Sequence, residues 1–104
     1  MTELLTTIRD LIQRSDRDLD RIERTLTDGY AHALSLEAER SRLQRRMTEV
    51  AQGIQRGDTA KKARELSTLA KRLDGNGDDL TRLRALLGDL RRHADGVRVG
   101  SPAR

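Results

Sequence analysis

Residues 5–54, LTTIRDLIQRSDRDLDRIERTLTDGYAHALSLEAERSRLQRRMTEVAQGI, decide the fold, because their aliphatic side chains repeat with the seven-residue period of a coiled coil. With Leu5 at heptad position a, twelve of the fifteen a and d positions are apolar, and the phase never changes. A pattern sustained over so many heptads predicts one amphipathic helix from about residue 3 to 55. The a positions are Leu5, Ile12, Leu19, Leu26, Ala33, Arg40, Met47 and Ile54, and the d positions are Ile8, Ser15, Ile22, Gly29, Leu36, Leu43 and Val50.

A second heptad seam follows, in which nine of ten a and d positions are apolar. It predicts a second helix from about residue 58 to 96. Between the helices, Gly57 can adopt the left-handed conformation that ends a helix, and Asp58 can cap the next one, so we expect a turn at 56–58. The a positions are Leu66, Leu73, Leu80, Leu87 and Ala94, and the d positions are Leu69, Asn76, Leu83, Leu90 and Val97.

Together these patterns predict an all-α fold. Residues 1–98 form a long antiparallel two-helix coiled-coil hairpin, and residues 99–104 form a disordered tail. Asp28-Gly29 predicts a kink in the first helix, and residues 74–77 (Asp-Gly-Asn-Gly) are a strong turn signal. Leu73 and Leu80 nevertheless keep the heptad phase, which favours a continuous or kinked second helix. The alternative is a third helix that begins at this glycine cluster and folds back.

Composition narrows the class of protein. Of the 104 residues 37% are charged and only Tyr30 is aromatic, which disfavours a compact globule with a large core. There is no cysteine, so no disulfide or thiolate metal site can form. Charges interrupt every apolar run and the first residues lack a basic region, so we expect no membrane span, no signal peptide and a cytoplasmic location.

The predicted register places polar residues at one level of the seam. If the turn centres near Gly57, Arg40 lies opposite Asp74 and next to Asn76. Such a polar core layer can fix the register of a coiled coil at some cost in stability. The alternative is that these side chains extend to solvent and pair only weakly.

The same register leaves the start of the chain uncovered. Val97 falls opposite residue 17, so residues 1–16 would have no partner within the hairpin. An apolar stripe exposed to water is unfavourable, so we expect it to drive self-association into a helical bundle or to bind a helix of another protein. The alternative is a frayed N-terminus in a monomer. This association stripe consists of Leu4, Leu5, Ile8, Leu11 and Ile12.

Charge is distributed unevenly along the chain. Residues 1–39 contain five basic and nine acidic side chains, residues 40–72 ten basic and three acidic, and residues 73–104 six basic and five acidic. The net charges are therefore −4, +7 and +1, and the hairpin tip is basic. A basic tip could bind nucleic acid or another polyanion, although no aromatic side chain is at hand for base stacking. The basic tip consists of Arg42, Arg45, Arg46, Lys61, Lys62 and Arg64.

No arrangement of residues predicts catalysis. His32 and His93 lie on different helices and do not face each other in the predicted register. Asp74, Asn76 and Asp78 match only the first ligands of a calcium loop, whose later positions are wrong. We therefore predict no catalytic, cofactor or metal site and no small-molecule substrate. The expected function is that of a non-enzymatic interaction protein, an adaptor, scaffold or assembly subunit that acts through helix–helix association.

Overall fold

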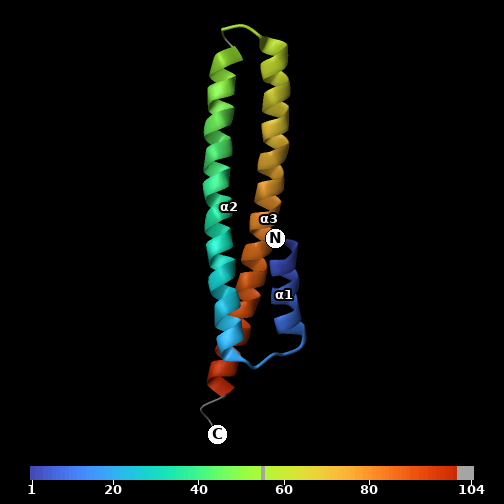
Figure 1. Ribbon diagram of the computed structural model, residues 1–104, viewed down its shortest axis with the longest axis vertical. Helices are drawn as coiled ribbons and strands as arrows, with labels where there is room; N and C mark the ends of the chain where they lie inside the picture. Colours follow the sequence, from blue (N-terminus) through green and yellow to red (C-terminus); the bar gives the residue numbers. More distant parts are fainter. Residues whose placement is uncertain (55, 101–104) are drawn as a thin grey trace. The chain divides into compact units, whose positions relative to one another are not determined.

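The computed structural model describes residues 1–54 and 56–100, and these residues form three α-helices and no strand (Figure 1). The helices are α1 (Thr2–Gln13), α2 (Leu19–Ile54) and α3 (Thr59–Gly100). The predicted all-α class is confirmed. The predicted helix 3–55 is, however, wrong as a single element, because residues 14–18 interrupt it.

The interruption contains a left-handed residue, which follows Arg14. Ser15 has φ +52°, and its N–H donates to the Ile12 carbonyl (3.1 Å) while the Asp16 N–H donates to the Leu11 carbonyl (3.1 Å). These two hydrogen bonds commonly close a helix at a left-handed residue, since they satisfy its last carbonyl groups. The heptad pattern continues through this loop, which is why the periodicity predicted an unbroken helix.

Helix α2 begins with a capped first turn. The Asp18 carboxylate accepts the Arg21 N–H (3.2 Å), and the Asp18 carbonyl accepts the Ile22 N–H (3.0 Å). An aspartate at this position satisfies an N–H group that has no partner within the helix. The cap therefore sets the start of α2 at Leu19.

The turn between α2 and α3 lies where the sequence predicts it. Gly57 has φ +114° and Asp58 has φ +57°, so both residues are left-handed. The Asp58 carbonyl accepts the Lys62 N–H (3.2 Å), and this hydrogen bond closes the first turn of α3. Gln55, where the first helix was expected to end, lies outside the described residues.

Helix α3 is continuous from Thr59 to Gly100. It passes through the glycine cluster at 74–77 without a break, so the alternative of a third helix starting there is wrong. The third helix, α1, arises instead from the loop at 14–18. Helix α3 also extends beyond its expected end, since Val99 and Gly100 are helical. The remainder of the predicted disordered tail, 101–104, lies outside the described residues.

The chain divides into two compact units, which we describe separately. Unit 1 contains Met1–Leu34 and Thr81–Arg104, and so combines α1 with the first part of α2 and the last part of α3. Within this unit α1 lies beside α3 and runs antiparallel to α2 (Figure 1). The three helices bury one apolar core, to which each contributes a stripe. Its members are Leu5, Ile8, Leu11, Ile22, Leu26, Ala33, Leu83, Leu87, Leu90, Ala94 and Val97.

Unit 2, Ser35–Leu80, is an antiparallel hairpin formed by the end of α2 and the start of α3. Its core cluster consists of Leu43, Val50 and Leu69. A two-helix hairpin buries one narrow seam, whereas a three-helix unit can enclose a core from all sides. The two units therefore differ in how completely they cover the same heptad pattern.

Candidate helix-docking surfaces

The seam of unit 2 is only half covered. Its d positions on both helices are buried, and these are Leu36, Leu43, Val50, Leu69 and Asn76. Of the a positions beside them, Arg40, Met47, Ile54, Leu66 and Leu73 remain partly exposed, whereas Leu80 is buried. Three of these, Met47, Leu66 and Leu73, pack against the Leu43–Val50–Leu69 cluster, and we call this set the open seam.

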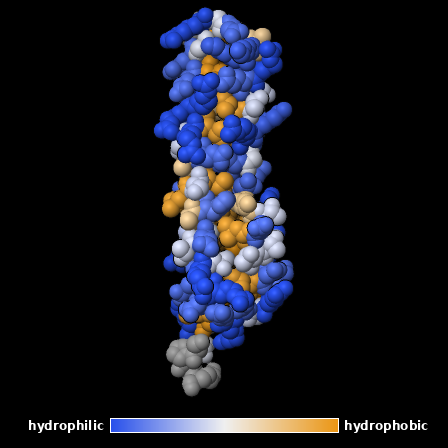
Figure 2. Space-filling model, viewed as in Figure 1, coloured by the Kyte–Doolittle hydropathy of each residue, from blue (hydrophilic) through white to orange (hydrophobic). Residues whose placement is uncertain are grey.

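Figure 2 shows apolar side chains along the middle of the upper region, between hydrophilic flanks. In unit 1, which contains a third helix, the a positions of the same two helices are mostly buried. Leu26, Ala33, Leu87 and Ala94 are buried, and Leu19 is partly buried. The open seam therefore marks the part of the heptad pattern that two helices alone do not cover. It has the chemistry to accept a further amphipathic helix.

The predicted polar core layer is only partly assembled. Asn76 is buried in unit 2, and its Nδ2 donates to the Leu36 carbonyl (2.9 Å). Its Oδ1 is buried without a hydrogen-bond partner among the described residues. Arg40 extends over Gly77, where a Cβ would lie 3.0 Å from the guanidinium. Asp74 is exposed, which contradicts its predicted place in the layer. The hydrogen-bond partner of Asn76 is therefore the backbone carbonyl of Leu36 and not, as the sequence predicted, a charged side chain. A pattern of side chains in the sequence gives no information about such a backbone partner.

The residues of the basic tip all belong to unit 2. Arg42, Arg45, Lys61 and Arg64 are exposed, whereas Lys62 is partly buried. The Lys62 ammonium lies over Gly53, where an added Cβ would come within 2.6 Å of Nζ. The tip therefore presents positive charge from both helices of the hairpin.

Arg46 differs from its neighbours because it is engaged in ion pairs. Its guanidinium donates to Glu65 through Nη2 (2.6 Å) and Nε (3.0 Å), and to Glu49 through Nη1 (3.4 Å). The hydrogen bond that Arg46 donates to Glu65, and then the negative charge of Glu65, raise the pKa of Arg46 above its ordinary value, and Glu49 adds to the effect. A cross-helix pair of this kind makes Arg46 less available to an external anion than exposed Arg45.

The association stripe is not exposed in unit 1. Leu5, Ile8 and Leu11 are exposed by only 6%, 0% and 4%, and Leu4 and Ile12 are partly buried. The expectation that residues 1–16 lack a partner within the chain is therefore wrong. The loop at 14–18 lets α1 fold back and bury the stripe within its own unit.

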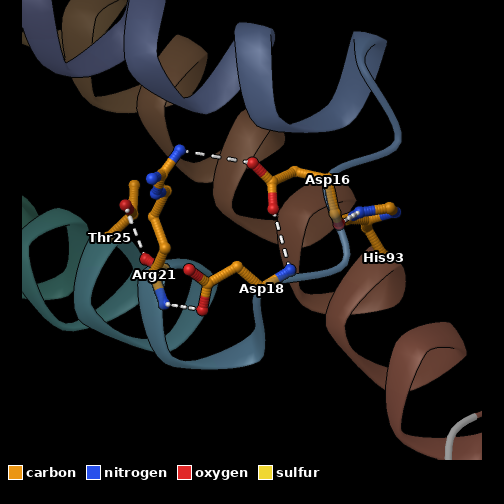
Figure 3. A network of polar contacts seen from close by, with 5 residues as sticks. All are labelled: Asp16, Asp18, Arg21, Thr25 and His93. Carbon is orange, nitrogen blue, oxygen red and sulfur yellow. Dashed lines mark hydrogen bonds and ion pairs between the residues drawn. The ribbon is translucent and has the colours of Figure 1, made fainter.

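A polar network holds the loop between α1 and α2 in place (Figure 3). The Asp16 carboxylate accepts the Asp18 N–H (2.8 Å) and pairs with the Arg21 guanidinium (3.4 Å). His93, on α3, approaches from the other side, and its Nε2 donates to the Asp16 carbonyl (2.6 Å). Thr25 is buried, with its hydroxyl donating to the Arg21 carbonyl (2.9 Å). The loop is thus tied to both α2 and α3.

Sequence reasoning missed this loop, although its local signals are present. Ser15 is a polar residue at a d position, and Asp18 stands where a helix cap would be expected. The aspartate-rich segment also supplies the side chain that accepts the Asp18 N–H two residues on, a common turn device. The role of His93 has no comparable signal, because it depends on the fold-back of α1.

Within residues 1–54 and 56–100, no group of three or more potential metal ligands lies close together. No helix in this part of the chain is both long and apolar enough to cross a membrane. A shallow hollow on unit 1 is lined by Asp20, Glu23, Arg24 and Thr27. These side chains are the ordinary solvated face of α2, so the hollow does not point to a ligand.

Comparison of the chain with protein-family models, with curated proteins and with solved structures gave no match. Function must therefore be argued from the surfaces described above.

Proposed function

We propose that this chain is a non-enzymatic interaction protein, an adaptor or scaffold that binds a partner helix on the open seam of unit 2. The observation that carries the proposal is the partial exposure of Met47, Leu66 and Leu73 beside a buried heptad core. A helix that laid its own apolar stripe there would complete a three-helix layer. Removing apolar surface from water favours this by about 25 cal/mol per Å².

The positive charge of the hairpin favours one kind of partner helix for the open seam. Residues 40–72 carry ten basic and three acidic side chains, so a second basic helix would be repelled. An amphipathic helix with acidic residues beside its apolar stripe would be attracted and oriented. We therefore expect a partner with glutamate or aspartate flanking a leucine-rich stripe. We place the interaction in the cytoplasm, a compartment that suits a chain without cysteine.

Two synthetic helical peptides test the proposal. Both carry leucine at heptad positions a and d, and one has glutamate and the other lysine at the flanking positions. We expect the full-length chain to bind the acidic peptide at least about tenfold more tightly in fluorescence anisotropy, with the preference reduced by salt. Equal binding of the two peptides, or no binding of either, would contradict the proposal.

Variants of the open seam locate the binding site. Met47→Gln combined with Leu73→Gln should weaken binding of the acidic peptide at least about tenfold, since apolar contact is lost. Leu34→Gln is a matched control, because Leu34 is 66% exposed and belongs to unit 1. Circular dichroism must show that both variants remain helical. Equal weakening by the control would place the peptide elsewhere.

The second candidate function is binding of nucleic acid or another polyanion by the basic tip. It is favoured by the exposure of Arg42, Arg45, Lys61 and Arg64 on one hairpin. Arg45 and Arg46 form a matched pair, because both are exposed but Arg46 is already bound to Glu65. In salt-dependent gel shifts, Arg45→Gln should weaken retention of nucleic acid more than Arg46→Gln. Retention insensitive to salt and to both variants would exclude this function.

A further inference from the structure

We propose that α1 is an exchangeable arm, which can leave its own unit 1 and occupy the same place on unit 1 of a second copy of this chain. The result is a domain-swapped dimer in which residues 14–18 become helical. The loop, the heptad phase and the burial of α1 each support this.

The heptad phase is the first observation. Ile12 occupies an a position, Ser15 a d position and Leu19 the next a position, although a loop separates them. A loop that had only to connect two helices could have any length. This one has the number of residues that a continuous helix requires. The same sequence therefore fits both a folded-back α1 and an unbroken helix through residues 2–54.

The second observation is the conformation of the hinge. Ser15 is left-handed at φ +52°, a region that residues other than glycine, asparagine and aspartate seldom adopt. In a continuous helix Ser15 would have an ordinary conformation, and its N–H would bond four residues back instead of to Ile12. Backbone hydrogen bonding is thus retained in both states. Opening loses the contact of His93 with the Asp16 carbonyl but relieves the strain at Ser15.

The third observation identifies what would occupy the place of α1 on unit 1. The face of α2 and α3 in unit 1 is complete only when Leu5, Ile8 and Leu11 of α1 cover it, as their near-complete burial shows. A second copy offers the same three side chains in the same spacing, so exchange rebuilds the whole interface. Short hinge loops under strain favour this route to dimers. In a swapped dimer the two-fold axis passes near residues 14–18 of both copies.

This inference does not rest on the peptide-binding proposal, because it concerns unit 1 alone. A chain that fails to bind an acidic helix can still exchange α1. The experiments below therefore leave the open seam unaltered.

Different substitutions at Ser15 should shift the equilibrium between the folded-back loop and the continuous helix in opposite directions. Ser15→Gly favours the left-handed loop and disfavours a helix, so we expect the dimerisation constant to fall at least about tenfold. Ser15→Ala favours the helix, and Ser15→Leu adds an apolar side chain at the d position. Both should raise the constant by at least about tenfold, as measured by light scattering after size-exclusion chromatography over a concentration series.

A distance measurement identifies exchange. The chain has no cysteine, so Thr6→Cys and Ala31→Cys, both at exposed positions, can be spin-labelled without side reactions. With α1 folded back the two Cα atoms lie roughly 15 Å apart, whereas 25 residues of continuous helix separate them by about 38 Å. Diluting labelled with unlabelled chains restricts the pulsed electron-resonance signal to distances within one chain.

The proposal requires a dimer that shows the long distance in the Ser15→Ala and Ser15→Leu chains. Ser15→Gly should show the short distance and remain monomeric. If the alanine and leucine variants are monomers, the proposal is wrong. A dimer that keeps the short distance would also overturn it, because association would then use another surface.

Discussion

The glycines of this protein show how the same residue can have opposite effects at different places. Gly29 lies in the core of unit 1 against Leu87, and an added Cβ would overlap the Leu87 side chain. Gly75 is exposed on α3, and an added Cβ would meet no atom within 4 Å. The first glycine permits close packing, whereas the second only weakens the helix.

Substitution by alanine should therefore separate the two positions. Gly75→Ala should raise the free energy of unfolding by about 0.5–1 kcal/mol, because alanine has the higher helix propensity. Gly29→Ala should lower it by about 1–3 kcal/mol, because the core must shift to admit the methyl group. Chemical denaturation followed by circular dichroism measures both. A stabilising Gly29→Ala would show that the core of unit 1 is loosely packed.

Asn76 is a second residue whose effect can be predicted. It is buried with one hydrogen bond to the Leu36 carbonyl, while its Oδ1 has no partner among the described residues. Asn76→Leu should raise the free energy of unfolding by about 1 kcal/mol, since an unsatisfied buried acceptor is removed. Asn76→Asp should lower it, because a carboxylate would replace the amide at a buried site. Thermal unfolding of the three chains gives the order directly.

At the scale of single elements, the caps determine where helices begin. The Asp18 carboxylate accepts the Arg21 N–H at the start of α2. Asp18→Ala should cost about 1 kcal/mol of stability, whereas Asp18→Asn should cost little, because asparagine caps equally well. Asp20→Ala is the control, because Asp20 lies two residues later in the first turn of α2. If both alanine variants lose the same stability, the effect comes from charge near the helix start and not from the cap.

Sequence predicted the elements unevenly, for physical reasons. The turn at Gly57-Asp58 and the continuity of α3 follow from local chemistry and from heptad phase, which sequence reports directly. The loop at 14–18 preserves that phase, so periodicity could not reveal it. Of the proposed site residues, those of the basic tip were predicted from charge alone, and all but Lys62 are exposed. The burial of Leu5, Ile8 and Leu11 could not, because it depends on the fold-back of α1 against a distant part of the chain.

At the scale of the whole molecule, α1 changes what truncation should do. The sequence alone suggested that residues 1–16 carry an exposed stripe, so that their removal would reduce association. The structure reverses the expectation, because removal exposes the part of the unit 1 core against which Leu5, Ile8 and Leu11 are buried. We expect a chain that begins at residue 14 to be less stable and to associate more strongly in light scattering. A stable monomer would mean that α1 contributes little to unit 1.

The loop that joins α1 to α2 also determines where a protease can cut. Arg14 and Arg17 are exposed on this segment, which is not helical, whereas helical backbone must unfold locally before it fits a protease. Brief digestion with trypsin should therefore cleave the folded-back chain at these two arginines and at Arg56, which is exposed on the turn between α2 and α3. A chain in which residues 14–18 are helical would resist cleavage at Arg14 and Arg17. Once cut, α1 is held only by its apolar contacts, and a helix so short is marginal alone in water. Cleavage at one loop would thus convert a tethered arm into a peptide that can be lost, and it would leave the apolar face of unit 1 permanently open.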